Sequence, residues 1–161
     1  MELRVGFGFD VHKLEVGHQF WLGGILVPHN KGATGHSDAD VLIHAICDAL
    51  LGAANMGDIG KYFPDNDIKF KGIDSKILLT NVRDIVFNKG YELCNIDSTI
   101  CLETPKISNY TSEMSATIAN CMQVEKDLIS IKATTTEKLS FVGREEGVSA
   151  YATVLIRKTY K

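Results

Sequence analysis

Residues 36–52 read HSDADVLIHAICDALLG, and this stretch decides how the rest of the chain is arranged. Ser37 or Asp38 can act as an N-cap, and the apolar residues that follow predict a helix ending near Gly52 or Gly57. The helix is apolar on nearly all sides, which is typical of a helix buried in a core. We therefore expect the other elements to pack around it.

Three polar residues recur every four positions along this helix: Asp40, His44 and Asp48. The spacing places them in one stripe. A buried polar stripe has to be satisfied, and a metal ion bound by His44 would do so, with the two carboxylates orienting the imidazole. The alternative is a stripe that faces solvent or hydrogen-bonds another subunit, and the helix alone does not separate the two.

A second pair of metal-ligand residues follows an apolar strand predicted over residues 3–9. Because side chains alternate along a strand, Asp10 and His12 leave the same face with their Cα atoms about 7 Å apart, while Val11 points the other way, into the core. With His44 they make three ligands, which suits a catalytic zinc-type site that keeps one position open. Alternatively, Asp10 ends the strand and His12 begins a turn.

Composition indicates one globular domain over residues 1–161, with 45% hydrophobic residues and a net charge of −3. A basic face is missing, so nucleic acid is not expected as a partner. No apolar run is long enough to cross a bilayer and the first residues are no signal peptide, so no membrane partner is expected either. Four cysteines without CxxC spacing indicate a reducing compartment. We expect a cytoplasmic bacterial protein, or the mature form of a plastid-type organelle protein.

The remaining pattern alternates strands with helices. Further strands are predicted over 19–27, paired with the first strand, and over 91–103, 128–134 and 148–158. Further helices are predicted over 74–90 and 109–122. This order indicates an α+β fold, a single-domain mixed β-sheet covered on one face by helices. The other sheet face also needs a cover, and another copy of the chain is the natural one.

Three other stretches have residues suited to ligand binding. Residues 57–65 (GDIGKYFPD) combine carboxylates with glycines, which suits sugar hydroxyls, although an ordinary surface turn has the same composition. Residues 132–138 (KATTTEK) can hold phosphate oxygens and a second hard metal, although a threonine run is also typical of plain strand. Residues 141–147 (FVGREEG) form a charged turn, which is also what a solvated hairpin would show.

Taken in order, these motifs resemble one family. The series is GFDVH at 8–12, HSD at 36–38, His44, GDIGK at 57–61, FPD at 63–65, KATTTEK at 132–138 and GR at 143–144. It resembles the 2-C-methyl-D-erythritol 2,4-cyclodiphosphate synthases over nearly the whole chain. The resemblance implies a phosphorus-oxygen lyase of the non-mevalonate isoprenoid pathway. Its substrate would be 4-diphosphocytidyl-2-C-methyl-D-erythritol 2-phosphate and its leaving group cytidine monophosphate.

The resemblance also implies roles for individual residues. Asp10, His12 and His44 would bind one divalent transition metal of the zinc type, and Glu137 a magnesium or manganese ion bridging the substrate diphosphate. His36 and Thr135 would stabilise the transition state. The substrate-binding positions would be Ser37, Asp58, Ile59, Gly60, Phe63, Asp65, Leu102, Lys106, Ala133, Thr134, Phe141 and Arg144.

The family resemblance further implies a homotrimer with sites at the subunit interfaces and Arg144 near the axis. Two alternatives share the three metal ligands. One is a phosphohydrolase that uses a metal-activated water. The other is a non-catalytic trimeric module with a structural metal, in which His18 or His29 would supply a closed fourth position.

Overall fold

The computed structural model describes residues 2–159, and its centre is a five-stranded mixed sheet. The strands run in the order β4-β1-β7-β5-β6. All neighbours pair antiparallel except β5 and β6, which are parallel. Their bounds are β1 (Leu3–Val16), β4 (Lys31–Thr34), β5 (Tyr91–Cys101), β6 (Ile129–Thr134) and β7 (Gly147–Lys158).

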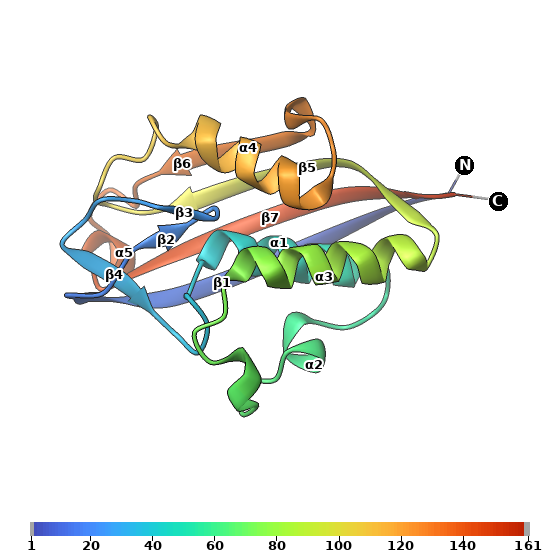
Figure 1. The fold of residues 1–161 in the computed structure, drawn as a ribbon. Helices are drawn as coiled ribbons and strands as arrows, with labels where there is room; N and C mark the ends of the chain where they lie inside the picture. The colour runs from blue at the N-terminus through green and yellow to red at the C-terminus, as the bar shows by residue number, and fades with distance from the viewer. Residues whose placement is uncertain (1, 160–161) are drawn as a thin grey trace.

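Three long helices cover one face of this sheet (Figure 1). They are α1 (Val41–Ala53), α3 (Ser75–Asn88) and α4 (Thr111–Met122). The shorter elements are β2 (Trp21–Leu22), β3 (Ile25–Leu26), α2 (Ile59–Tyr62), α5 (Ser140–Gly143) and the 3₁₀ turns at Ile68–Phe70 and Lys126–Leu128. The predicted α+β fold of one helix layer on a mixed sheet is confirmed. None of the helices in residues 2–159 is both long and apolar enough to span a membrane.

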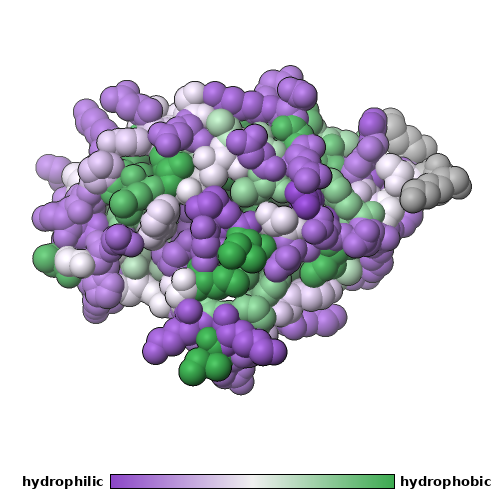
Figure 2. Space-filling view, viewed as in Figure 1, coloured by the Kyte–Doolittle hydropathy of each residue, from purple (hydrophilic) through white to green (hydrophobic). Residues whose placement is uncertain are grey.

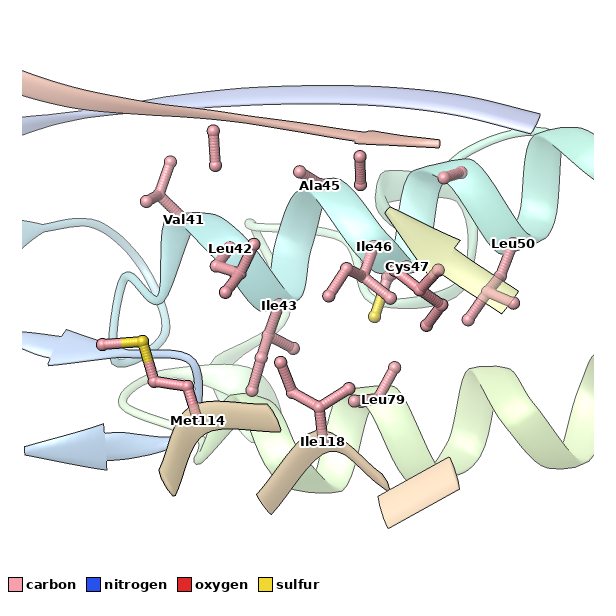
Figure 3. Close-up of a cluster of buried hydrophobic side chains, with 14 of the residues drawn as sticks. Val41, Leu42, Ile43, Ala45, Ile46, Cys47, Leu50, Leu79, Met114 and Ile118 are labelled. Carbon is pink, nitrogen blue, oxygen red and sulfur yellow. The ribbon is translucent and has the colours of Figure 1, made fainter. Parts of the chain in front are cut away.

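Helix α1 lies at the middle of the core, as its sequence predicts. Ten of its 13 residues are buried, and Ile43 points toward Ile118 of α4 (Figure 3). On the other side α1 lies directly on β1, because the facing positions are Gly6 and Gly8. A Cβ atom at Gly6 would come within 1.8 Å of the Ala49 carbonyl oxygen. These glycines therefore bring the helix and the strand close enough to share a site.

The start of α1 differs from the prediction. The N-cap is Asp40 and not Ser37 or Asp38, and its carboxylate accepts a hydrogen bond from the Ile43 backbone N–H. Asp40 is fully buried and also accepts from the N–H groups of Gly23 and Gly24, at 3.0 and 2.6 Å. One carboxylate thus satisfies both a helix N-terminus and the turn of the β2–β3 hairpin.

That hairpin replaces the single strand predicted over 19–27. Gly23 and Gly24 adopt positive φ values of 61° and 80°, a conformation that glycine tolerates and that reverses the chain. The hairpin forms its own two-stranded sheet, and β4 instead pairs with the end of β1. The predicted pairing of 19–27 with the first strand is therefore wrong.

Strand β1 is longer than predicted and faces the other way. It continues through Asp10 and His12 to Val16, so neither residue ends the strand. Even-numbered positions from Gly6 to His12 face α1, whereas Val11 is 43% exposed on the open side of the sheet. The prediction that Val11 points into the core is wrong, because the glycines at even positions are what make room for the helix.

The other elements follow the prediction within a few residues. Helix α3 begins after an Asp74 cap and β5 buries Ile96, Ser98 and Ile100 on one face. The turn predicted over 141–147 contains the single-turn helix α5 before β7 starts. All four cysteines are free.

Candidate active site and metal centre

Three metal-ligand side chains converge where α1 crosses β1. Asp10 Oδ2 lies 2.9 Å from His12 Nε2 and 3.0 Å from His44 Nδ1, and the two ring nitrogens are 3.1 Å apart. Ligand atoms around a tetrahedral zinc ion, each at about 2.0–2.1 Å, lie roughly 3.3 Å from one another. The group therefore fits a single divalent ion, and in residues 2–159 it is the only such group of histidine, cysteine and acidic residues.

The protonation of the group is set by its members. Burial works against ionisation of Asp10, but hydrogen bonds from His12 and His44 outweigh it and hold the pKa of that carboxyl well below its usual range. Burial lowers the pKa of the His44 imidazole, but the hydrogen bond to Asp10 outweighs this effect and leaves that pKa raised. A negative carboxylate next to two imidazoles is a donor set that attracts a cation.

The second ring nitrogen of His44 is held by hydroxyl groups. His44 Nε2 lies 3.0 Å from Ser37 Oγ and 3.0 Å from Ser75 Oγ. The predicted orientation of the imidazole by Asp40 and Asp48 is wrong, because both carboxylates are used elsewhere. Asp40 caps α1, and Asp48 accepts from the Ile59 N–H at 2.8 Å, which joins α1 to α2.

A cleft of about 500 Å³ opens above the three ligands. One wall is the loop between α2 and α3, which His36 contacts through Nε2 and the Asp67 carbonyl oxygen at 3.2 Å. Of the predicted site residues, the cleft is lined by Asp10, His12, His36, Ser37, His44, Ile59, Gly60, Phe63 and Asp65. Asp58 does not line it; the Asp58 side chain caps α2 through the Lys61 N–H.

A separate pocket of about 230 Å³ lies at the ends of β5 and β6. It contains the predicted residues Leu102, Lys106, Ala133, Thr134 and Thr135. Asp10 and Ala133 belong to one row across the sheet, through Ala150 of β7 and Ile100 of β5. With adjacent strands about 4.8 Å apart, the two are separated by roughly 14 Å. In one chain the cleft and the pocket are thus two distinct sites.

Besides Asp58, the predicted residues Glu137, Phe141 and Arg144 line neither space. Thr135 Oγ1 donates to Glu137 Oε1 at 3.3 Å, and Glu137 adopts a positive φ of 53° in an exposed loop. Arg144 forms a two-point ion pair with Glu146, with both contacts at 3.0 Å. The Phe141 ring lies against Gly147 at the start of β7. All three are on the segment between β6 and β7.

Two residues near the metal group are not predicted as site residues by the sequence. Ser75 falls in the predicted start of the second helix, and Asp38 is predicted only as a possible N-cap. In the structure Ser75 is fully buried, contacts His44 and donates its hydroxyl proton to Asp38. The spacing of 31 residues between His44 and Ser75 gives no local signal, so only the fold reveals the contact.

Comparison with known proteins agrees with this site. The profile of the YgbB family matches residues 3–157. A Bacteroides fragilis protein named 2-C-methyl-D-erythritol 2,4-cyclodiphosphate synthase is 61% identical over 158 residues, which cover 98% of this chain and 99% of that protein. The chain belongs to the YgbB family. It has 2-C-methyl-D-erythritol 2,4-cyclodiphosphate synthase activity, a lyase activity of the non-mevalonate isoprenoid pathway.

Solved structures of YgbB family relatives have the same fold. The bifunctional IspDF of Campylobacter jejuni has a TM-score of 0.95 and 40% identity, covering 98% of this chain and 43% of that one. IspF of Plasmodium falciparum in a CDP complex has a TM-score of 0.86 and 32% identity, covering 98% and 97%. Family membership decides against the phosphohydrolase and the non-catalytic module. Within residues 2–159 neither His18 nor His29 joins the metal group.

Proposed function

We propose that the cleft at Asp10, His12 and His44 is where 4-diphosphocytidyl-2-C-methyl-D-erythritol 2-phosphate cyclises and releases cytidine monophosphate. The observation that carries this proposal is the three-ligand group on the floor of the cleft, with its fourth side toward the open space. A zinc-type ion bound there would supply Lewis-acid stabilisation to a phosphate oxygen.

The chain itself acts by positioning and charge stabilisation. The 2-phosphate of the substrate is the nucleophile, so the protein needs no serine or cysteine for attack. His36 and Ser37 present polar groups beside the three ligands, where they bind the diphosphate of the substrate. Phe63 and Asp65 on the opposite wall hold the methylerythritol part. Asp58 and Gly60, at the start of α2, hold the ribose.

The pocket at the ends of β5 and β6 takes the cytidine part. CDP occupies the Plasmodium falciparum relative, and a CDP-bound synthase structure is 34% identical to this chain with a TM-score of 0.88. Lys106 and the threonines of this pocket offer a cation and hydroxyls for a phosphate. Glu137, which Thr135 contacts, would hold a magnesium or manganese ion, which would neutralise charge on the substrate diphosphate.

We place these two halves in neighbouring subunits of a homotrimer. The open face of the sheet exposes Val5, Phe7, Phe9 and Val11 by 67, 64, 44 and 43%, and the Tyr151 ring lies 5.0 Å from that of Phe9. On the helical side, by contrast, hydrophilic residues predominate (Figure 2). An exposed apolar strip of this kind along β1 is typical of a subunit interface. A second copy covering it also brings a cytidine pocket to the cleft of its neighbour.

The organisms of the relatives bear on the proposed location. Bacteroides and Porphyromonas proteins at 60–61% identity support a bacterial cytoplasmic enzyme over a plastid-type one. The activity is tested by incubating the purified chain with the substrate and following phosphorus NMR signals. We expect cytidine monophosphate and the cyclic diphosphate in equal amounts. An acyclic methylerythritol bisphosphate beside the cytidine monophosphate, or inorganic phosphate, without a cyclic product would indicate hydrolysis and overturn the proposal.

A further inference from the structure

We infer that Ser75, held by Asp38, is a positioning residue that fixes the tautomer of His44 and so leaves Nδ1 free to bind the metal. The inference rests on the proposed metal site. It concerns residues that do not touch the ion and that come from the start of a different helix, α3.

The contacts form a chain from a carboxylate to the metal group. Ser75 is fully buried, and its Oγ lies 3.0 Å from His44 Nε2. The same hydroxyl donates to Asp38 Oδ1. The Ser75 backbone N–H donates to the other Asp38 oxygen at 2.9 Å, and the Asp40 N–H donates to Oδ1 at 3.2 Å. Asp38 is therefore held from three sides.

The direction of each hydrogen bond follows from the donors available. An ionised carboxylate only accepts, so the single proton of the Ser75 hydroxyl points to Asp38. The Oγ atom can then only accept from His44, which requires a proton on Nε2. Without an ion, Nδ1 can also carry a proton, which it donates to Asp10. A divalent ion would replace that proton, so Nδ1 would supply its lone pair while Nε2 keeps its hydrogen. That lone pair faces Asp10 and His12, where the ion binds.

Ser37 lies at the same 3.0 Å distance from His44 Nε2 but in a different setting. It lines the cleft and is partly exposed, and its Oγ accepts from the Ala39 N–H at 3.2 Å. No hydrogen bond to a carboxylate directs its proton, so that proton can turn toward a substrate. Ser37 cannot fix the tautomer, which makes it a matched control for Ser75.

The start of α3 explains why Ser75 can serve this role. Asp74 caps the helix by accepting from the Lys76 N–H at 2.9 Å, so the Ser75 hydroxyl is not needed as a cap. In Ser75→Ala the backbone N–H that binds Asp38 is retained. The substitution thus removes one hydroxyl and leaves the helix start in place.

The test measures zinc affinity by competition with a chromophoric chelator, for wild type, Ser75→Ala and Ser37→Ala. Loss of a residue that orients a metal-bound histidine typically weakens affinity about 10- to 100-fold. We expect a loss in that range for Ser75→Ala and less than about threefold for Ser37→Ala, which should instead raise KM. Nitrogen-15 NMR of the zinc-loaded protein should show the Nε2–H of His44 protected from exchange with solvent in wild type and exchanging faster in Ser75→Ala.

The outcomes separate this inference from the proposed metal site. If the wild type does not bind one zinc ion per chain, the proposed metal site itself is wrong. If wild type binds zinc and Ser75→Ala binds it equally well, Ser75 does not position His44. Should Ser75→Ala fail to fold, Asp38→Asn gives the same test. Both Asp38 oxygens accept hydrogen bonds, and the amide of an asparagine would place its NH₂ group against one of the donors, so the Ser75 hydroxyl would lose its fixed direction. Zinc-loaded wild type in which His44 carries its proton on Nδ1 and not on Nε2 overturns the inference by itself.

Discussion

The metal cleft and the cytidine pocket differ in what holds their side chains. The metal ligands stand on a long strand and a buried helix, and the side chains of Asp10, His12 and His44 are 26, 16 and 13% exposed. Thr134 ends the edge strand β6 and Thr135 follows it; both are exposed, as is Glu137 in the loop beyond. The first half is built within one chain, whereas the second lies open at an edge. The chain alone is therefore preorganised to bind a metal ion, whereas we propose that the reaction needs both halves, brought together by two subunits.

Removing one of the three metal ligands should have the largest effect. His44→Ala leaves two ligands, and we expect zinc affinity to fall by more than about 100-fold, beyond the loss typical of an orienting partner. Turnover should be abolished while the circular dichroism spectrum stays that of the wild type. Elemental analysis and a cytidine monophosphate assay measure both. His18→Ala, at an exposed histidine outside the group, is the control. Full zinc occupancy and normal turnover in His44→Ala would refute the assignment.

Breaking the subunit contact should separate the two halves. Phe9→Asp places a carboxylate on the open sheet face, where burying it against another copy costs several kcal/mol. Since 1.4 kcal/mol is a factor of ten, association should weaken by about 100-fold or more. We expect monomers by light scattering, with most turnover lost and zinc content unchanged.

The control for Phe9→Asp is Ile77→Asp. Ile77 is 51% exposed, but it lies on α3, in the helix layer away from the open sheet face. Its assembly and turnover should match the wild type. A fully active monomeric Phe9→Asp would show that one chain contains the complete site.

The sequence predicts the features that depend on local patterns and misses those that depend on tertiary packing. Helix α1 and its metal ligand were predictable because period and composition are local, and Asp10 and His12 follow from alternation in a strand. The role of Asp40 was not, because its partners Gly23 and Gly24 are set by tertiary packing. The glycine pair did carry a turn signal that the apolar residues around it masked.

The direction of β1 shows a second limit. Alternation puts Asp10 and His12 on one face and Val11 on the other, but it does not say which face the helices cover. Hydrophobicity favours Val11 inside, and the structure has Gly6 and Gly8 there because α1 needs space. The apolar side is left for another surface. When both faces of a sheet carry apolar residues, the alternation along one strand does not show which face lies in the core.

A smaller effect is expected at Glu137, on the exposed half. Glu137→Gln keeps the shape but removes the charge that a magnesium-type ion requires. Turnover should fall by at least about tenfold, the smaller loss typical when a residue that supports a metal site is changed, and the zinc content should stay unchanged. Raising magnesium or manganese should recover part of the rate. If the dependence of the rate on these ions matches the wild type, Glu137 acts in some other way.

The smallest expected effect comes from restoring shared sites in mixed trimers. One inactive parent carries His44→Ala in the metal half, and the other carries Thr135→Ala with Lys106→Ala in the cytidine half. When equal amounts are unfolded together and refolded, each interface takes its two halves at random. About a quarter of interfaces then combine two intact halves, by the combinatorics of a closed ring. Turnover should return to about that fraction of the wild type, because distant substitutions act independently. Mixed trimers that are confirmed by mass spectrometry and remain inactive would mean that each site is built within one chain, and the division between the two halves would not be one between subunits.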